Sequence, residues 1–589
     1  MQTLASTQLP ATAAPADSAS FPWRPDCGDG TYRNPIIYAD YSDPDVIRVG
    51  NDFYLTASSF NCTPGLPILH SRDLVNWRII GHALKNLPHP RYARVRPGCG
   101  VWAPALRFHA GKFWIFFPTP DEGIYVVTAN DPAGKWSEPH LLQRGKGLID
   151  PCPLWDDDGR AYLVHAYSYS RARIKHILRV RPMAPDGSKL FGKGQIVFHE
   201  PEKHPILEGP KFLKKDGWYY ILAPAGGVPT GWQVALRSRH IYGPYEDRIV
   251  LGQGSTPVNG PHQGALLDTP NGDWWFIHFQ DAGVYGRICH LQPVVWRDQW
   301  PLMGAQNGNG IGEPVLHCEK PVENGPMLIP QTSDEFNSSK LGLQWQWHAN
   351  HKKSWYSLAR RKGWLRLYPQ FVSSGVPAPV APPPSAGPSD FKAAHFRDKL
   401  SALPNLLLQK FPARSFTVET FFNFVPKQSG EEAGLIVAGK SSATFCVEKS
   451  GSGNRLVLRV NGVEKFVQEN VPSGIKLRAS VENGGLTSFS FGAFDEPHLE
   501  RGKTFGSAAA GAPPPHTQPR SVLQAVHGFN ARTVLENSPK GFVRVPERFQ
   551  AEQGVWIGAK IGLYSITRKR TGHKGFVDVD YFRFSTLQC

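Results

Sequence analysis

Long apolar runs are missing from this sequence of 589 residues. No stretch of about 20 consecutive apolar residues occurs, so we expect no transmembrane helix and no membrane partner. Residues 1–23 have neither a basic start nor a continuous apolar core, which is untypical of a secretory signal peptide. A cytoplasmic protein is therefore expected as encoded, with secretion as the alternative.

Cysteine is also scarce. The chain has 8 cysteines, and no two of them form a CxxC pair, which argues against a zinc site. They are too few for a chain of this length to indicate a disulfide framework.

Acidic residues are outnumbered, with 49 Asp and Glu against 65 Lys and Arg, for a net charge of +16. The basic residues are scattered, apart from the short cluster RKRTGHK at 568–574. No zinc-finger spacing and no RNA-binding signature accompanies them, so nucleic acid is not an expected partner. The sequence leaves the oligomeric state open.

Apolar residues with a helical period of 3.6 are rare as well. The chain contains instead 58 glycines, 53 prolines and 12% aromatic residues, a composition typical of many turns and short strands. We therefore predict a mainly β protein, and the length predicts at least two domains.

A pattern of about 50 residues recurs five times. Each copy has a polar or aromatic residue near a Pro or Gly, an apolar strand, a turn with Gly or Asp, and a strand rich in aromatics. The copies are DPDVIRVGNDFYLTAS, WAPALRFHAGKFWIFF, DPCPLWDDDGRAYLVHA, EGPKFLKKDGWYYILAP and HQGALLDTPNGDWWFIHF. This period is that of a four-stranded propeller blade, so a five-bladed β-propeller is predicted.

The residue that leads each copy is expected to open the innermost strand of its blade. Because inner strands surround the central axis, these residues should converge at one end of the channel. They are Asp43, Trp102, Asp150, Glu208 and His262.

Three carboxyl groups at one channel mouth fit the hydrolysis of a glycosidic bond. One ionised carboxylate activates water, a protonated one donates to the leaving oxygen, and a third raises the pKa of the acid. The tryptophan offers a flat surface on which a sugar ring can stack. Each residue also has a structural reading: Asp43 as a turn cap, Trp102 as core packing and His262 as a hydrogen-bonded core histidine.

At these residues the chain resembles glycoside hydrolase family 43, whose members include five-bladed inverting β-xylosidases and α-L-arabinofuranosidases. The matching motifs are SDPDVIRVGNDFYL, SRDLVNW, GVWAPALRFHAGKFW, IDPCPLWDDDGRAYLV, LEGPKFLKKDGWYY and YGRICHLQPVVW. Together they cover most of residues 30–300.

The resemblance implies a role for each matching position. Asp43 would be the general base, Glu208 the general acid, and Asp150 the residue that tunes the acid's pKa and orients it. The substrate-binding residues implied are Arg287, His262, Phe60, Trp102 and, more loosely on the leaving-group side, Trp232. The resemblance implies no required cofactor; a structural calcium ion near His262 is the one metal expected, without a catalytic part.

A second domain follows the repeats. Short alternating strands such as SFTVETFFNF and VDVDYFRF predict a β-sandwich, which resembles the jelly-roll domain of many family 43 xylosidases. We expect a flexible tail at 1–29, the propeller at 30–306, a linker at 307–329 and the sandwich at 330–589. Two stretches rich in Pro and Ala, 373–390 and 506–519, are expected to form flexible loops in the sandwich.

The expected activity is exo-acting, inverting removal of terminal pentoses from xylan-derived oligosaccharides, with β-xylosidase favoured. An α-L-arabinofuranosidase, or an enzyme with both activities on arabinoxylan or arabinan, is the alternative. A propeller that binds carbohydrate without catalysis is the remote one. The inverting mechanism predicts that the two catalytic carboxyls lie roughly 6.5–9.5 Å apart.

Overall fold

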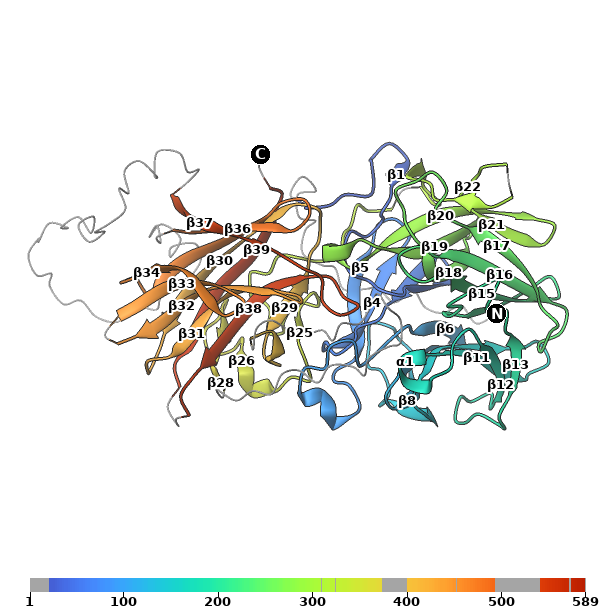
Figure 1. Ribbon diagram of the computed structural model, residues 1–589, viewed down its shortest axis with the longest axis horizontal. Helices are drawn as coiled ribbons and strands as arrows, with labels where there is room; N and C mark the ends of the chain where they lie inside the picture. Colours follow the sequence, from blue (N-terminus) through green and yellow to red (C-terminus); the bar gives the residue numbers. More distant parts are fainter. Residues whose placement is uncertain are drawn as a thin grey trace, which may run out of the picture.

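The computed structural model describes residues 21–308, 310–323, 325–372, 400–451, 453–492, 541–570 and 574–587. Within them the protein is almost entirely β, with a propeller (blue to green in Figure 1) beside a β-sandwich (orange to red). The predicted loops 373–390 and 506–519 lie outside the described residues. Across these ranges, no helix has the length and apolarity needed to cross a membrane.

Five sheets form the blades, and each contains four consecutive antiparallel strands, to which the sheet of blade 4 adds two more. Blade 1 contains β2 (Asp45–Val49), β3 (Asp52–Thr56), β4 (Gly65–Ser71) and β5 (Arg78–Leu84). Blade 2 contains β6 (Ala105–His109), β7 (Lys112–Thr119), β8 (Gly123–Ala129) and β9 (His140–Arg144). Blade 3 contains β10 (Leu148–Trp155), β11 (Ala161–Tyr167), β12 (Leu178–Met183) and β13 (Gln195–Phe198). The five-bladed propeller predicted from the repeat is confirmed.

Blades 4 and 5 complete the ring. Blade 4 contains β14 (Lys211–Lys215), β15 (Trp218–Ala225), β16 (Trp232–Ser238) and β17 (Glu246–Leu251). Blade 5 contains β18 (His262–Asp268), β19 (Trp274–Asp281), β20 (Arg287–Arg297) and β21 (Trp300–Met303). The stretch 307–329, read from the sequence as a linker, adds β23 (Gly312–Glu313) to blade 4, where it pairs with β17 and with β22 (Ala305–Gln306). It also contains β24 (His317–Glu319), which pairs with β1 (Thr31–Arg33).

The predicted hairpins join the first two strands of every blade. The glycine of each turn has a positive φ, between 62° and 91°, as a tight hairpin requires. These glycines are Gly50, Gly111, Gly159, Gly217 and Gly272. The strands that follow them are nearly continuous apolar runs, since they are covered on both faces; in β7 all residues except the first are buried.

The segment before blade 1 closes the ring. Ile37 exchanges backbone hydrogen bonds with Cys289 of β20, and the Tyr41 amide donates to the Arg287 carbonyl at 3.0 Å. Residues 36–41 therefore clamp blade 5 against blade 1 immediately before Asp43.

Two sheets form the sandwich. The first contains β25 (Gln346–Trp347), β28 (Gln370–Phe371), β29 (Leu407–Lys410), β31 (Glu431–Ala438), β32 (Ser442–Ser450), β33 (Gly453–Val460), β34 (Val463–Gln468) and β38 (Lys560–Thr567). The second contains β26 (Tyr356–Ser357), β27 (Leu365–Leu367), β30 (Phe416–Val425), β35 (Gly474–Val481), β36 (Leu486–Gly492), β37 (Phe542–Gln550) and β39 (Phe576–Ser585). Alternate side chains of β35 are buried, which is the pattern that predicted the sandwich.

Helical segments are short. Within the described ranges they are η2 (Pro90–Ala93), α1 (Tyr169–Ala172), η3 (Gly283–Tyr285), η4 (Lys353–Trp355) and η5 (Leu400–Ala402).

The two domains share a broad, ordered interface. Thr63 and Trp347 exchange backbone hydrogen bonds, and Tyr38, Tyr285 and Ile288 of the propeller belong to the same apolar core as the sandwich. The sandwich is therefore packed firmly on the propeller.

Candidate active site

Asp43 and Asp150 occupy the same unusual backbone conformation. Their φ angles are 53° and 54°, in the left-handed region, which aspartate adopts more readily than most residues. Gly209 (φ 62°) and Gln263 (φ 28°) occupy the matching place in blades 4 and 5. Trp102, Glu208 and His262 stand one residue before that place. The sequence analysis assumed that the five leading residues share one register. The structure shows that they do not.

Asp43 is surrounded by hydrogen-bond donors. Its Oδ2 accepts from Ser42 Oγ (2.8 Å) and Ser58 Oγ (2.5 Å), and its Oδ1 accepts from Arg287 Nη1 (2.9 Å). The residue is 5% exposed. Three donors, one of them a cation, fix the carboxylate in one orientation.

Glu208 and Asp150 are linked through Gly209, the residue that follows Glu208. The backbone N–H of Gly209 donates to Asp150 Oδ2 at 2.7 Å, which places the two carboxyl-bearing residues side by side. The Glu208 side chain keeps 30% of its surface exposed. In the described part of the chain its carboxyl accepts no hydrogen bond.

The environment raises the pKa of both carboxyls. Burial raises the pKa of Glu208 to about 8, and the charges of Asp150 and Asp43 add to this while Arg287 opposes it. Burial likewise raises the pKa of Asp150 to about 7, with the Gly209 N–H opposing the shift and Asp43 adding to it. Because the two groups interact, their protons belong to the pair. At neutral pH Glu208 holds a proton that it can donate.

Arg287 connects the propeller site to the sandwich. It begins β20, and its Nη1 donates to both Ser42 Oγ (2.7 Å) and Asp43 Oδ1. Its guanidinium carbon lies 4.8 Å from the centroid of the Phe279 ring and 5.4 Å from that of Trp556. Trp556 belongs to the sandwich, so the second domain reaches the site.

The sandwich segment 554–558 is the part of the site that the sequence analysis missed. Asp40 Oδ2 accepts from the Gly558 N–H at 3.1 Å, while its Oδ1 accepts from the Arg287 N–H at 3.0 Å. A side chain at Gly98 would collide with Val555, 2.7 Å away, and come within 3.2 Å of Trp556. The only sequence signal was a tryptophan among glycines, QGVWIGAK, whose position depends on domain docking.

Two of the predicted aromatic residues lie beside this segment. Phe60 and Val101 exchange backbone hydrogen bonds, and Trp102 Nε1 donates to the Gly98 carbonyl at 3.1 Å. The Arg171 guanidinium lies 5.0 Å from the Trp102 ring centroid. Phe60 is buried, whereas Trp102 is half-buried and retains surface for a ligand.

His262 lies under Glu208. Its Nε2 is 3.8 Å from Glu208 Oε1, and burial lowers the pKa of the imidazole to about 3, so the ring is neutral and forms no ion pair. Neither ring nitrogen has a hydrogen-bond partner among the residues that the structure describes. Calcium prefers six to eight oxygen ligands. Among the described residues no group of three or more His, Cys, Asp or Glu side chains is placed to hold a metal. The protein side chains here do not fit a calcium cage, and the calcium remains a prediction.

Trp232 lies farther out than the other predicted residues. It begins β16, two strands from Glu208 across blade 4, and its Nε1 lies 3.4 Å from His204 Nδ1. No contact with the carboxyl groups is present within the described ranges, so its assignment to the leaving-group side remains a prediction.

A five-bladed propeller that gathers three carboxyl groups, an arginine and aromatic rings at one place has the equipment of a carboxylate-based glycosidase. The comparisons agree: residues 32–301 match the family described as glycosyl hydrolases family 43, and 333–382 with 390–507 match the β-xylosidase C-terminal concanavalin A-like domain. The chain belongs to glycoside hydrolase family 43.

Curated relatives support the assignment. A protein of Xylanibacter ruminicola is 49% identical over 344 residues, covering 58% of this chain and 63% of its own length. A β-xylosidase of Formosa agariphila is 37% identical over 373 residues, covering 58% and 62%. The match thus spans less than two thirds of each of these relatives. A non-reducing end α-L-arabinofuranosidase of Bacteroides ovatus is 31% identical, covering 69% of this chain and 73% of its own.

Solved structures show the same fold. A family 43 protein of Bacillus licheniformis superposes with a TM-score of 0.70 at 23% identity, over 95% of this chain and 100% of its own. A xylan β-1,4-xylosidase of Bacillus halodurans gives 0.69 at 22% identity, over 94% and 99%.

Proposed function

We propose that this protein is an inverting exo-glycosidase that releases terminal pentoses from xylan-derived oligosaccharides, with β-xylosidase the favoured activity. This proposal rests mainly on the contrast between two carboxyl groups. Asp43 is held by three donors, including Arg287, whereas Glu208 has a raised pKa and a partly exposed side chain. The first suits a base and the second an acid.

The reaction takes one step. A water molecule attacks the anomeric carbon while Asp43 takes one of its protons, and the bond from that carbon to the leaving oxygen breaks as Glu208 transfers its proton to that oxygen. The hydrogen bonds from Ser42, Ser58 and Arg287 hold Asp43 in the orientation that this proton transfer needs. Asp150 contributes negative charge that keeps the proton on Glu208.

Exo action is supported by the sandwich. Trp556 and Val555 project between Gly98 and Arg287, so the second domain covers one side of the carboxyl cluster. A covered side favours the end of a chain over its interior. The C-terminal match to the β-xylosidase accessory domain, together with the name of the Formosa agariphila relative, favours xylose.

An α-L-arabinofuranosidase, alone or with xylosidase activity on arabinoxylan, is the second candidate, supported by the name of the Bacteroides ovatus relative. Rates on 4-nitrophenyl β-D-xylopyranoside and α-L-arabinofuranoside, measured side by side, decide between the two. Proton NMR of early product tests the mechanism: inversion of a β-xyloside must first yield α-xylose. Early β-xylose would contradict it. Wild-type turnover by Asp43→Asn and Glu208→Gln variants would contradict the assigned residues, and absence of turnover by the unaltered protein on both substrates would favour a propeller that only binds sugar.

A further inference from the structure

The direction of the strands determines which loops surround the carboxyl cluster. The first strand of each blade begins beside the cluster and runs away from it, and the neighbouring strands alternate in direction because their pairing is antiparallel. The segments that follow the second and the fourth strand of a blade therefore return to the end of the propeller that holds the carboxyl groups. We call this end the mouth.

Positive charge is concentrated in one sector of the mouth. The segments 85–104, 120–122, 144–147 and 168–177 lie at blades 2 and 3 and contain nine Lys and Arg residues but only two acidic residues. The last of them, 168–177, includes α1 and is called the α1 segment below. The surplus of cations in this sector is a large part of the net charge of +16, to which the proposed catalytic residues give no role.

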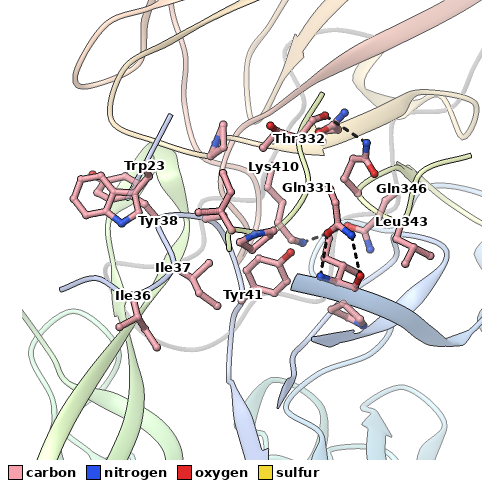
Figure 2. A pocket seen from close by; sticks show the side chains of 18 of the residues that line it. Trp23, Ile36, Ile37, Tyr38, Tyr41, Gln331, Thr332, Leu343, Gln346 and Lys410 are labelled. Atoms are coloured by element: carbon pink, nitrogen blue, oxygen red, sulfur yellow. Dashed lines mark hydrogen bonds between the residues drawn. The ribbon is translucent and has the colours of Figure 1, made fainter. Parts of the chain in front are cut away.

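The surplus is local. The segments 226–231, 252–261 and 282–286, which form the mouth at blades 4 and 5, contain no charged residue. The cavity between the two domains (Figure 2) has one formally charged side chain among the described residues that line it, Lys410, and its amine donates to Gln346 Oε1 at 3.3 Å. Neither place offers several cations to a ligand.

The two acidic residues of the basic sector already have partners. Glu122 Oε1 lies 3.1 Å from Arg91 Nε, and Glu122 Oε2 accepts from the Tyr92 hydroxyl at 2.9 Å. Asp121 Oδ1 lies 3.4 Å from Arg171 Nε. The other cations of the sector form no ion pair within the described ranges, so their charge is available to a ligand.

The α1 segment lies between Trp102 and the proposed acid. The side chain of Arg171 is 3% exposed, and its guanidinium carbon lies 5.0 Å from the Trp102 ring centroid. Farther along the segment, His176 Nδ1 accepts a hydrogen bond from the backbone N–H of Ile206, two residues before Glu208. The segment is thus fixed on the side from which Glu208 is proposed to protonate the leaving oxygen.

The outer surface of the α1 segment combines cations with apolar groups. Arg173 and Lys175 are exposed, and the charged group of each lies 5.6 Å from the centroid of the Tyr169 ring. Ile174, between them, is 41% exposed. A sugar ring can pack against the apolar groups while an acid group on it meets the two cations.

We propose that Arg173 and Lys175 bind a uronic acid that the leaving part of the substrate carries as a side group, which makes acidic xylo-oligosaccharides the preferred substrates. This proposal rests on the proposed function, because that function places the leaving sugar beside Glu208. Since the substrate is a sugar chain, a carboxylate is the anionic group that one of its own rings can carry. Each exposed ion pair raises affinity by up to about fivefold, and cations at the mouth also speed the approach of an anionic ligand.

Two substrates that differ in one group test the proposal. The first is xylotriose with glucuronic acid on the xylose next to the non-reducing end, and the second is the same compound with the carboxyl reduced to an alcohol. In about 20 mM NaCl the unaltered protein should release the terminal xylose from the acidic compound with a kcat/KM about fivefold to tenfold higher. In roughly 0.5 M NaCl this ratio should approach one, because salt screens exposed charges.

A pair of double variants locates the effect. Arg173→Gln with Lys175→Gln should lower the ratio to below about twofold and leave kcat/KM on the reduced compound within about twofold, which also shows that the variant is folded. Lys112→Gln with Lys135→Gln removes the same charge from two exposed lysines at the opposite end of blade 2 and should leave the ratio unchanged. The proposal is overturned by a ratio near one in the unaltered protein, by an unchanged ratio in the first double variant, or by an equal loss in both.

Binding without turnover separates this proposal from the proposed function. Calorimetry with the Glu208→Gln variant should show the same preference for the acidic compound over the reduced one, and equal affinities would overturn the preference. If the unaltered protein hydrolyses neither these compounds nor xylotriose, the proposed function is wrong, and the two affinities still decide whether the α1 segment binds the acid. If it hydrolyses both compounds equally well, only the proposal for Arg173 and Lys175 fails.

Discussion

Two sets of charged side chains sit on the same inner strands of the propeller, only a few residues apart. In the first, three carboxyls (Asp43, Asp150 and Glu208) have one nearby guanidinium, Arg287. In the second, the buried carboxylate of Asp45 lies 2.8 Å from Arg107 and 3.5 Å from Lys211.

The two sets differ in their balance of charge. In the first, burial raises the pKa of Glu208 and of Asp150, the neighbouring carboxyls add to the shift, and a proton remains available for chemistry. In the second, two cations keep the carboxylate of Asp45 paired and tie blades 1, 2 and 4 together. Asp45 also accepts from the Leu106 N–H at 2.6 Å, a cross-blade contact of a structural residue.

The largest expected effect comes from removing either of the two carboxyls of the first set that we propose to act in catalysis. Asp43→Asn and Glu208→Gln should each lower kcat about 10²–10⁴-fold, the usual contribution of a general base or acid, as measured on 4-nitrophenyl xyloside. A substrate with a more acidic leaving group, the 2,4-dinitrophenyl xyloside, should restore much of the rate to Glu208→Gln and little to Asp43→Asn. Asp273→Asn, at an exposed hairpin, is the control. Equal restoration in both variants would contradict the assigned roles.

Removing a cation from the second set should lower stability and leave kcat nearly unchanged. Arg107→Met leaves the buried Asp45 without its nearest cation and should lower the free energy of unfolding by about 3 kcal/mol, measured by urea denaturation. The fraction that remains folded should keep kcat within about threefold, since Arg107 contacts none of the three catalytic carboxyls in the described structure. If kcat falls while the free energy of unfolding is unchanged, the second set contributes to catalysis and not to stability, which would contradict this prediction.

The pH dependence sharpens the comparison further. As the proposed general acid, Glu208 must be protonated to act, so kcat/KM should fall as pH rises through its pKa of about 8. Asp150→Asn removes a neighbouring negative charge, which lowers the pKa of Glu208 and should move this alkaline limb down by about one unit. A limb that stays in place would mean that burial alone holds the proton.

Much of the first set could be predicted, and little of the second. Asp43, Asp150 and Glu208 lead repeated motifs, so the symmetry of the blades brings them together whatever the loops do. Arg107 and Lys211 sit inside strands, where the register between blades decides which groups meet, and no sequence period reports that register.

Trp556 was hidden for a different reason. It lies far from Arg287 in the chain and meets it only through the docking of two domains, which follows from surface shape. The shift of one residue between Asp43 and Glu208 in their blades did have a sequence signal that the alignment of the repeats overlooked: Pro44 follows Asp43 directly, whereas Pro210 stands two residues after Glu208.

Trp556 provides the next prediction, on how far the first set depends on the sandwich. Trp556→Ala should raise KM about fivefold to tenfold while kcat changes less, because an aromatic surface beside Arg287 is lost and the carboxyls are not touched. Trp364→Ala, a half-buried tryptophan within the sandwich that stacks on Arg361, is the matched control and should leave KM unchanged. A large fall in kcat would mean that the sandwich orders the catalytic groups themselves.

The smallest effect is expected from chelation. A cation near His262 would lie close to the first set and would offset the negative charge of its carboxyls. Removal of the cation therefore tests whether the side chains alone determine the net charge at this place. The neutral imidazole and the lack of a carboxylate cage within the described residues indicate that a bound calcium ion would be held mainly by water. Dialysis against EDTA should therefore leave kcat/KM within about twofold, with calcium readdition as the control. If the loss is larger and calcium restores the activity, the metal contributes to the charge balance of the first set. Because a nearby cation lowers the pKa of a carboxyl group, the raised pKa of Glu208 would then require that the other carboxylates outweigh the metal.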